Sequence, residues 1–240
     1  MKLLISICYS LLFLMCINLQ AQGLYQKGTI TIKNGKSAEA YVQIDYRYPQ
    51  RFQNSITYIT PSTYAKFLKK GKIKGKKKIK LKPKEIEGFH LDNGQIFKTV
   101  SYADITGKAI KMMPKKLCME QLSSGEIDLY RLYSRTTGKI SYETADYVRK
   151  GGQELIDYIQ DNFQLLIQKE SKNPRNIMHI NLLNFIGDKH DIRDNYDTNY
   201  YGLRNQFTES QKEGKLVNKK FAASFVKMID DYNQHTLTGL

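Results

Sequence analysis

The chain has 240 residues, a formal net charge of +15 and 17 tyrosines but no tryptophan. Two of its three cysteines, Cys8 and Cys16, lie in an apolar N-terminal stretch. If that stretch is removed, only Cys118 remains, so the mature chain forms no intramolecular disulfide and at this length needs none to bury an adequate core. Cys118 itself lies in a predicted strand, where it is most simply a small buried hydrophobe.

The first 21 residues have the three-part layout of a secretory signal peptide. Lys2 precedes an apolar run over residues 3–17, and a polar stretch leads to the small residue Ala21. The run is shorter than the roughly 20 residues that cross a bilayer, so we predict cleavage after Ala21 rather than a membrane anchor. The bulky Met15 before Cys16 argues against lipid attachment. We therefore predict export to the periplasm, the outer membrane or the medium, with no transmembrane span in the mature chain.

Residues 22–149 are predicted to form an antiparallel β-rich region. The dipeptide Asn34-Gly35, which is typical of two-residue hairpin turns, separates two runs of alternating polarity. In the second run one face holds Ala40, Val42, Ile44 and Tyr46. Further turns are predicted at Asn93-Gly94, Ser124-Gly125 and Thr137-Gly138. This succession of hairpins indicates a meander, sandwich or roll.

A concentrated basic segment interrupts the β-rich region at residues 66–84. It holds eleven lysines and no acidic residue. Without Lys2 the chain carries +14, of which this segment supplies +11 and all other residues +3. Such runs are usually solvated and self-repelling, and Gly71 and Gly75 loosen the backbone further. We predict a long loop or an extended hairpin, whose end at residues 77–82 forms an edge strand.

Three interpretations of the basic segment compete. The lysines keep an exposed loop soluble, they contact a polyanionic surface, or they bind nucleic acid through its phosphates. The segment has no arginine or asparagine with which to contact base edges, and predicted export also argues against nucleic acid. An anionic envelope component such as lipopolysaccharide or acidic lipid, or another envelope protein, is the predicted partner. The candidate contact residues are Lys69, Lys70, Lys72, Lys74, Lys76, Lys77, Lys78 and Lys80.

Residues 150–240 are predicted to be helical and to pack on the β-rich region. Over residues 152–171 apolar side chains recur at helical spacing, namely Leu155, Ile156, Ile159, Phe163, Leu166 and Ile167. A second helix is predicted over 177–187. A last one is predicted over 218–234, with an apolar stripe of Phe221, Ala222, Phe225, Val226, Ile229 and Tyr232. Residues 188–207 are predicted to be a polar loop with a short helix near 203–207.

The sequence carries no common catalytic signature and predicts no cofactor. One stretch, residues 188–197, combines carboxylates with a histidine, a set that can bind a divalent cation. Within it His190, Asp191 and Asp194 are the candidate metal ligands. Lys189 and Arg193 lie among these acids, which favours a solvated polar loop instead.

Three stretches resemble a broad set of exported proteins of Bacteroidetes. They are KGTITIKNGKSAEAYVQI at 27–44, KPKEIEGFHLDNGQIFKT at 82–99 and GEIDLYRLYSRTTGKISY at 125–142. The resemblance implies an envelope location and supplies no catalytic residue, and the lysine-rich insertion departs from its pattern. We predict an exported α+β protein with a non-catalytic binding or accessory role. The alternative is a hydrolase or metal-dependent enzyme that uses the cluster at 188–197.

Overall fold

The computed structural model describes residues 24–103, 113–134, 152–170, 172–204, 206 and 216–234. These residues form an α+β fold with one antiparallel sheet of eleven strands and helices in the C-terminal part, so the predicted fold class is confirmed. The signal peptide at 1–21, the turn at Thr137-Gly138 and the predicted boundary between residues 149 and 150 lie outside the described residues.

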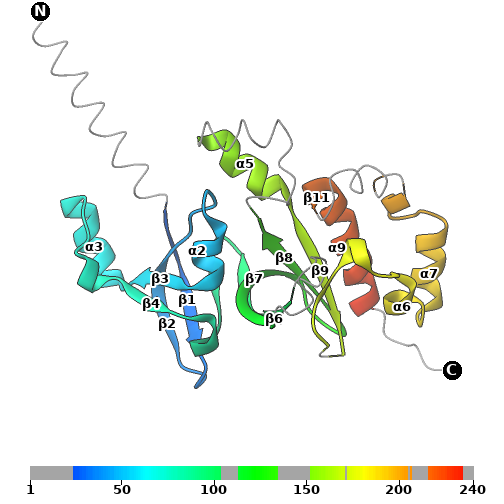
Figure 1. The fold of residues 1–240 in the computed structure, drawn as a ribbon, viewed down its shortest axis with the longest axis horizontal. Coiled ribbons are helices and arrows are strands. Elements are labelled where there is room, and N and C mark those ends of the chain that lie inside the picture. Colours follow the sequence, from blue (N-terminus) through cyan, green and yellow to red (C-terminus); the bar gives the residue numbers. More distant parts are fainter. Residues whose placement is uncertain are drawn as a thin grey trace, which may run out of the picture.

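The sheet has the strand order β10-β9-β8-β7-β6-β5-β1-β2-β3-β4, and β11 pairs with β9. Figure 1 shows β4 and helix α3 at one end of the molecule and helices α6 and α7 at the other. The strands are β1 (Tyr25–Ile32), β2 (Ser37–Gln43), β3 (Ile56–Ile59), β4 (Ile79–Leu81), β5 (Ile86–Leu91), β6 (Ile96–Tyr102), β7 (Lys115–Ser123), β8 (Ile127–Tyr133), β9 (Asn162–Lys169), β10 (Arg175–Asn176) and β11 (Val217–Asn218).

Helices connect or flank these strands. The α-helices are α2 (Pro49–Asn54), α3 (Pro61–Lys70), α5 (Gln153–Asp161), α6 (Leu183–Ile186), α7 (His190–Asp197) and α9 (Lys219–Gln234). Three short 3-10 helices, η1 (Gly75–Lys77), η2 (Pro83–Glu85) and η3 (Ile177–His179), complete the described part.

The predicted hairpins at Asn34-Gly35, Asn93-Gly94 and Ser124-Gly125 are confirmed, since they join β1 to β2, β5 to β6 and β7 to β8. Gly35 and Gly94 have φ of 77° and 91°, values that glycine adopts without steric cost. The face predicted to be apolar is also buried, comprising Ala40, Val42, Ile44 and Tyr46.

The main core includes side chains of β1, β2 and α2, and a large part of it lies between α9 and the sheet. Helix α9 packs on β7, β8 and β9, and it buries Phe221, Ala222, Phe225, Met228, Ile229 and Tyr232. The predicted last helix and its stripe are thus confirmed, except that Val226 is only half-buried. The other face of β6–β9 carries a second cluster of Val100, Tyr102, Met119, Tyr130, Leu132 and Leu166. Both faces of these central strands are therefore buried.

The single helix predicted over 152–171 is wrong in its second half. Helix α5 ends at Asp161, and the chain continues as strand β9, which pairs with β8, β10 and β11. In β9, Phe163, Leu165 and Ile167 join the main core while Leu166 faces the opposite cluster. A strand buried on both faces has a nearly continuous apolar run, which also matches helical spacing. The hydrogen bonds to the neighbouring strands make this segment a strand rather than a helix.

Two other helical predictions also need correction. The segment 177–187 is not one helix, because η3 and α6 are separated by residues with extended backbone such as Ile180. The segment 188–207 is not mainly loop, because α7 covers His190–Asp197. Ile192 of α7 is buried in the main core, and this contact stabilises the helix. The polar composition of the segment does not indicate a helix in the sequence.

Helix α3 is anchored on the sheet by a small apolar cluster. Phe67 is buried with Tyr25 and Ile59, and the Tyr64 ring stacks on the Tyr41 ring with centroids 3.7 Å apart. Local sequence also defines the helix, since the Thr60 hydroxyl accepts a hydrogen bond from the Thr63 amide at 3.3 Å, Pro61 begins it and Gly71 ends it at a φ of 65°.

The anchoring of α3 can be tested with two neighbouring residues of that helix. We expect Phe67→Ala to lower the free energy of unfolding by about 3 kcal/mol, because it removes a ring from a packed cluster. Leu68 is 50% exposed, so Leu68→Ala should change that free energy by at most about 0.5 kcal/mol. Urea denaturation of both variants measures the difference. Equal losses would contradict this account of how α3 is held.

Candidate functional site

The basic segment folds into regular structure. Its first lysines lie on α3, the next follow through η1, and Lys80 lies on β4. Among the described strands, β4 pairs only with β3 and ends the strand order. The predicted edge strand is thus confirmed, whereas the predicted long loop is wrong because Tyr64 and Phe67 dock α3 on the sheet. The lysines of residues 66–84 are all exposed, and we call them the cationic surface.

The cationic surface is not neutralised by the described part of the chain. Within that part, the ammonium nitrogen of none of its lysines lies within 4.0 Å of a carboxylate oxygen, although eleven other ion pairs form. Glu85, which directly follows the segment, accepts a hydrogen bond from the backbone amide of Lys82 at 2.6 Å. Among the described residues, the charge of the cationic surface is therefore not offset by ion pairs.

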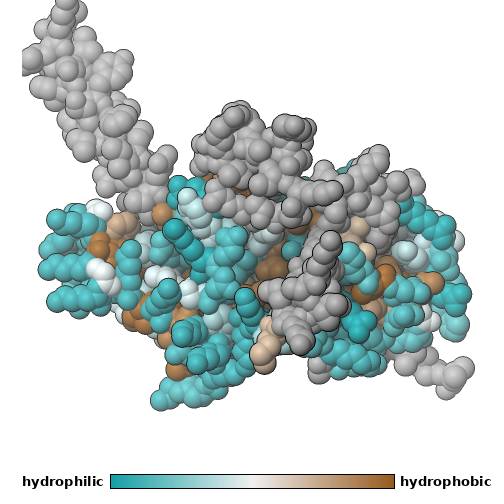
Figure 2. Space-filling view, in the orientation of Figure 1, coloured by the Kyte–Doolittle hydropathy of each residue, from teal (hydrophilic) through white to brown (hydrophobic). Residues whose placement is uncertain are grey.

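Two apolar side chains are exposed within the cationic surface. Leu68 on α3 is 50% exposed and Ile79 on β4 is 37% exposed. Figure 2 shows mainly hydrophilic side chains at the α3 end of the molecule, with hydrophobic patches between them. Lysines beside exposed apolar groups are the combination found in proteins that lie at an anionic membrane surface.

A groove extends the cationic surface toward the middle of the sheet. It has a volume of about 1010 Å³ and is lined by Asn54, Ser55, Lys80, Lys82, Pro83, Lys84, Glu85, Lys115 and Lys116. The Thr99 hydroxyl donates to the Pro83 carbonyl at 3.1 Å, which ties η2 to β6. Because β6 pairs with β7, this contact also places η2 near the first residues of β7.

Lys115 and Lys116 were not among the predicted contact residues. Both begin β7 and are exposed. The nearby Lys33 amine lowers the pKa of the Lys116 amine from its ordinary value, as expected where like charges are close. The only sequence signal for this extension was the adjacent pair of lysines, and its proximity to residues 82–84 follows from strand order rather than from spacing.

The acidic stretch 188–197 does not assemble a metal site in the described residues. There, no three His, Cys, Asp or Glu side chains come together in a way that could hold a metal ion. The candidate ligands His190, Asp191 and Asp194 therefore do not form such a group. Asp197 instead lies 3.6 Å from Arg193 and 3.5 Å from Arg204. The arrangement accords with a polar helix surface.

Asp188 belongs to a polar cluster that the sequence did not indicate. The Tyr232 hydroxyl lies 2.8 Å from an Asp188 oxygen and 2.6 Å from a Glu126 oxygen, and it accepts from the Lys169 amine at 2.6 Å. Lys189 donates to the Tyr232 carbonyl at 2.7 Å. Two lysines thus balance two carboxylates around a buried tyrosine. This cluster fixes the end of α9 against β8, β9 and the segment before α7.

The same contacts shift the pKa values of the carboxyl groups. A hydrogen bond from Tyr232 is the main reason that the pKa of Glu126 is lowered, with Lys189 adding to the effect. Burial alone would raise the pKa of Asp188, but hydrogen bonds from Lys169 and Tyr232 outweigh it and lower that pKa. Both carboxylates are therefore held ionised.

Cys118 is confirmed as a buried hydrophobe on β7. Burial raises the pKa of its thiol to about 12. The thiol therefore stays protonated at neutral pH and cannot act as a nucleophile there.

The chain matches no family model, no curated protein and no solved structure. The resemblance to exported proteins of Bacteroidetes and the predicted envelope location therefore stay predictions. Among the helices of the described residues, none combines the length and the apolar character that crossing a bilayer requires.

The polar cluster predicts a pH dependence of stability. A carboxylate with a lowered pKa stabilises the fold fully above its unfolded-state pKa, about 4.3 for glutamate, and this stabilisation is lost as the pH falls through the lowered value. We expect Tyr232→Phe to raise the pKa of Glu126 and to reduce the loss of stability between about pH 5 and pH 3. Carboxyl NMR titration and urea denaturation measure these two effects.

Tyr200→Phe is the matched control, because Tyr200 is 61% exposed and lies outside this cluster. It should leave both the pKa of Glu126 and the acid dependence unchanged. An unaltered pKa of Glu126 in Tyr232→Phe would contradict the assigned hydrogen bond.

Proposed function

We propose that this protein is a non-catalytic binding or accessory protein of the cell envelope, and that its cationic surface contacts an anionic partner such as lipopolysaccharide or acidic lipid. The observation that carries the proposal is the exposed set of lysines on α3, η1, β4 and η2, which has no carboxylate within ion-pair distance among the described residues. Free charge on a fixed scaffold is what an electrostatic contact requires.

The chemistry of the surface supports a polyanionic membrane partner over a sequence-specific one. Lysine is a compact, strongly hydrated point charge that recognises phosphate without demanding one geometry. Each lysine near an anionic membrane contributes about 1 kcal/mol, and the contribution declines within a Debye length. The exposed Leu68 and Ile79 add apolar groups that can enter the lipid interface.

No observation favours the alternative enzyme that would use residues 188–197. In the described part of the chain, Asp188 is engaged by Lys169 and Tyr232, and Asp197 by Arg193 and Arg204. These contacts hold the carboxylates in ion pairs and leave His190 without a described set of partner ligands.

The proposal predicts salt-sensitive binding that depends on α3. We expect the variant Lys66→Gln, Lys69→Gln, Lys70→Gln to bind vesicles of acidic phospholipid or lipopolysaccharide roughly 100-fold more weakly, because three lysines together contribute about 3 kcal/mol. Vesicle sedimentation at low and high salt measures the affinity. Binding of the unaltered protein should weaken as salt rises.

A charge-matched control removes three exposed lysines from the opposite part of the chain, Lys172, Lys220 and Lys227. This variant has the same net charge as the α3 variant but should keep its affinity for vesicles. If both variants lose affinity equally, net charge rather than the cationic surface is responsible. If neither does, the proposed function is wrong.

A further inference from the structure

We propose that a small pocket between Arg51 and Lys80, together with the adjoining lysine groove, binds a head group that carries at least two phosphates. This inference rests on the proposed function for the source of the ligand, an anionic envelope lipid, and deepens it by naming the chemistry that is recognised.

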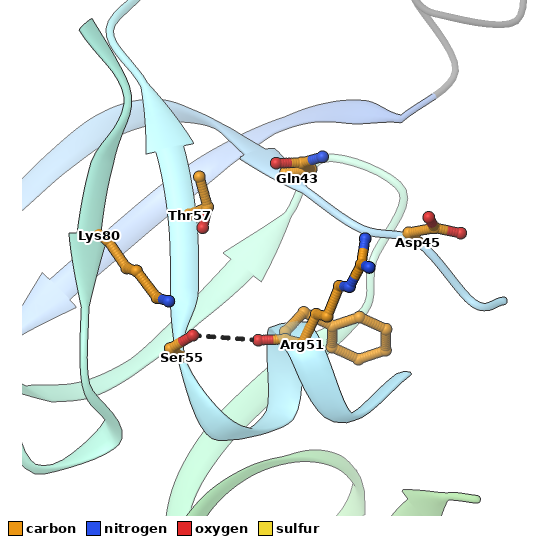
Figure 3. A pocket seen from close by; sticks show the side chains of 7 residues that line it. Gln43, Asp45, Arg51, Ser55, Thr57 and Lys80 are labelled. Carbon is orange, nitrogen blue, oxygen red and sulfur yellow. Dashed lines mark hydrogen bonds between the residues drawn. The ribbon is translucent and has the colours of Figure 1, made fainter. Parts of the chain in front are cut away.

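The pocket lies where α2 meets the β4 edge of the sheet. Its volume is about 230 Å³, and it is lined by Gln43, Asp45, Arg51, Phe52, Ser55, Thr57 and Lys80. Thr57 and Lys80 are directly paired residues of β3 and β4, so both side chains project from the same face of the sheet. Figure 3 shows Arg51 and Lys80 approaching the pocket from different elements, with Gln43 and Thr57 beside them.

The pocket carries a net positive charge. Its one carboxylate, Asp45, is paired with Arg47, whose Nε lies 2.9 Å from Oδ1 and whose terminal nitrogen lies 3.1 Å from Oδ2. In the described residues no carboxylate lies within 4.0 Å of Arg51 or Lys80. Arg51 is instead held by its stacking over the Tyr48 ring, 4.3 Å from the centroid. Both cationic side chains that line the pocket therefore lack a counter-ion at ion-pair distance among the described residues.

Two of the remaining lining residues, Gln43 and Thr57, can donate hydrogen bonds to a phosphate. The Ser55 hydroxyl donates to the Arg51 carbonyl at 3.3 Å, a contact that holds the end of α2. In the part of the chain that the structure describes, the Thr57 hydroxyl and the Gln43 amide have no hydrogen-bond partner within the protein. A guanidinium, an ammonium, a hydroxyl and an amide together supply the charge-assisted hydrogen bonds that phosphate oxygens accept.

The size of the pocket selects a compact group. Its volume of about 230 Å³ is below the range of about 300–1,000 Å³ that is usual for drug-sized ligands. A phosphate group fits within this volume. Arg51 also provides the forked donor that the lysine-only segment lacks, and folding alone brings it to Lys80.

The groove provides a second cationic subsite for the same ligand. It shares Ser55 and Lys80 with the pocket. Beyond these shared residues it presents four more lysines, Lys82, Lys84, Lys115 and Lys116. Its one carboxylate, Glu85, accepts from the backbone of Lys82. Two cationic subsites joined through Lys80 match two linked phosphates better than a single one.

The test uses inorganic pyrophosphate and inorganic phosphate as probes in isothermal titration calorimetry of the full protein. We expect saturable binding of pyrophosphate that is tighter than that of phosphate. Arg51→Gln and Lys80→Gln should each weaken pyrophosphate binding roughly tenfold or more, the cost of losing one charge-assisted contact. Arg51 and Lys80 are exposed, so both variants should fold, and circular dichroism verifies this.

Arg51→Lys keeps the charge but not the fork, and it should recover only part of the affinity. The α3 variant of Lys66, Lys69 and Lys70 should bind pyrophosphate as the unaltered protein does. If that variant binds vesicles normally while Arg51→Gln loses pyrophosphate, the proposed membrane contact is wrong and this site stands. Equal binding of phosphate and pyrophosphate, or undiminished binding by Arg51→Gln, overturns the inference.

Vesicles that contain a bisphosphorylated glycolipid distinguish the source of the phosphates. If the ligand is a lipid head group, pyrophosphate should displace the protein from these vesicles, and Arg51→Gln should bind them more weakly than the unaltered protein. If pyrophosphate binds at the pocket but displaces nothing, the ligand is a free phosphate compound, and the assignment to an envelope lipid is overturned.

Discussion

The structure depends on a balance between two opposing effects. The lysines of the cationic surface repel one another, and apolar contacts hold their backbone in place. Two unit charges 4 Å apart repel by about 1 kcal/mol in water, and salt screens this over about 8 Å. Against this repulsion stand the burial of Phe67 with Tyr25 and Ile59 and the pairing of β4 with β3. Because the lysine ammonium groups are exposed to solvent while their backbone is fixed, water and salt screen the repulsion between them.

Charged side chains have different surroundings at the two ends of the sheet. Near α9 the acids and lysines are paired, as Glu126 and Asp188 are with Lys169 and Lys189 around Tyr232. Near β4 the lysines have no such partners among the described residues. The first arrangement stabilises tertiary structure and depends on pH. The second adds mutual repulsion, and within the described residues it has no internal counter-charge at ion-pair distance.

Sequence reasoning succeeded where local signals determine the structure. Asn34-Gly35 and Asn93-Gly94 favour tight turns independently of the surrounding structure. The apolar residues of α9 recur at helical spacing, and this spacing does not also fit a strand. Sequence reasoning failed at β9, where an apolar run fits a helix and a doubly buried strand equally well. It also failed at α3, because the density of lysines concealed Tyr64 and Phe67 as an anchoring pair.

The candidate site was predicted only in part, for a related reason. Its lysines are contiguous in sequence and were identified from composition. Arg51, Lys115 and Lys116 are separated from them along the chain and become neighbours through the order of strands and the contact of η2 with β6. Composition reveals where charge accumulates, but only topology reveals which distant side chains share it.

The position of β4 at the margin of the sheet has a consequence for self-association. Its outward backbone groups have no strand beside them in the described structure, and such a margin normally invites a second copy to pair. Here any copy approaching in that way would bring its own ammonium groups against those already present. A strand rich in aspartate or glutamate would be attracted to the same edge. Charge at this edge therefore disfavours pairing with a second copy of the chain and favours pairing with an acidic strand.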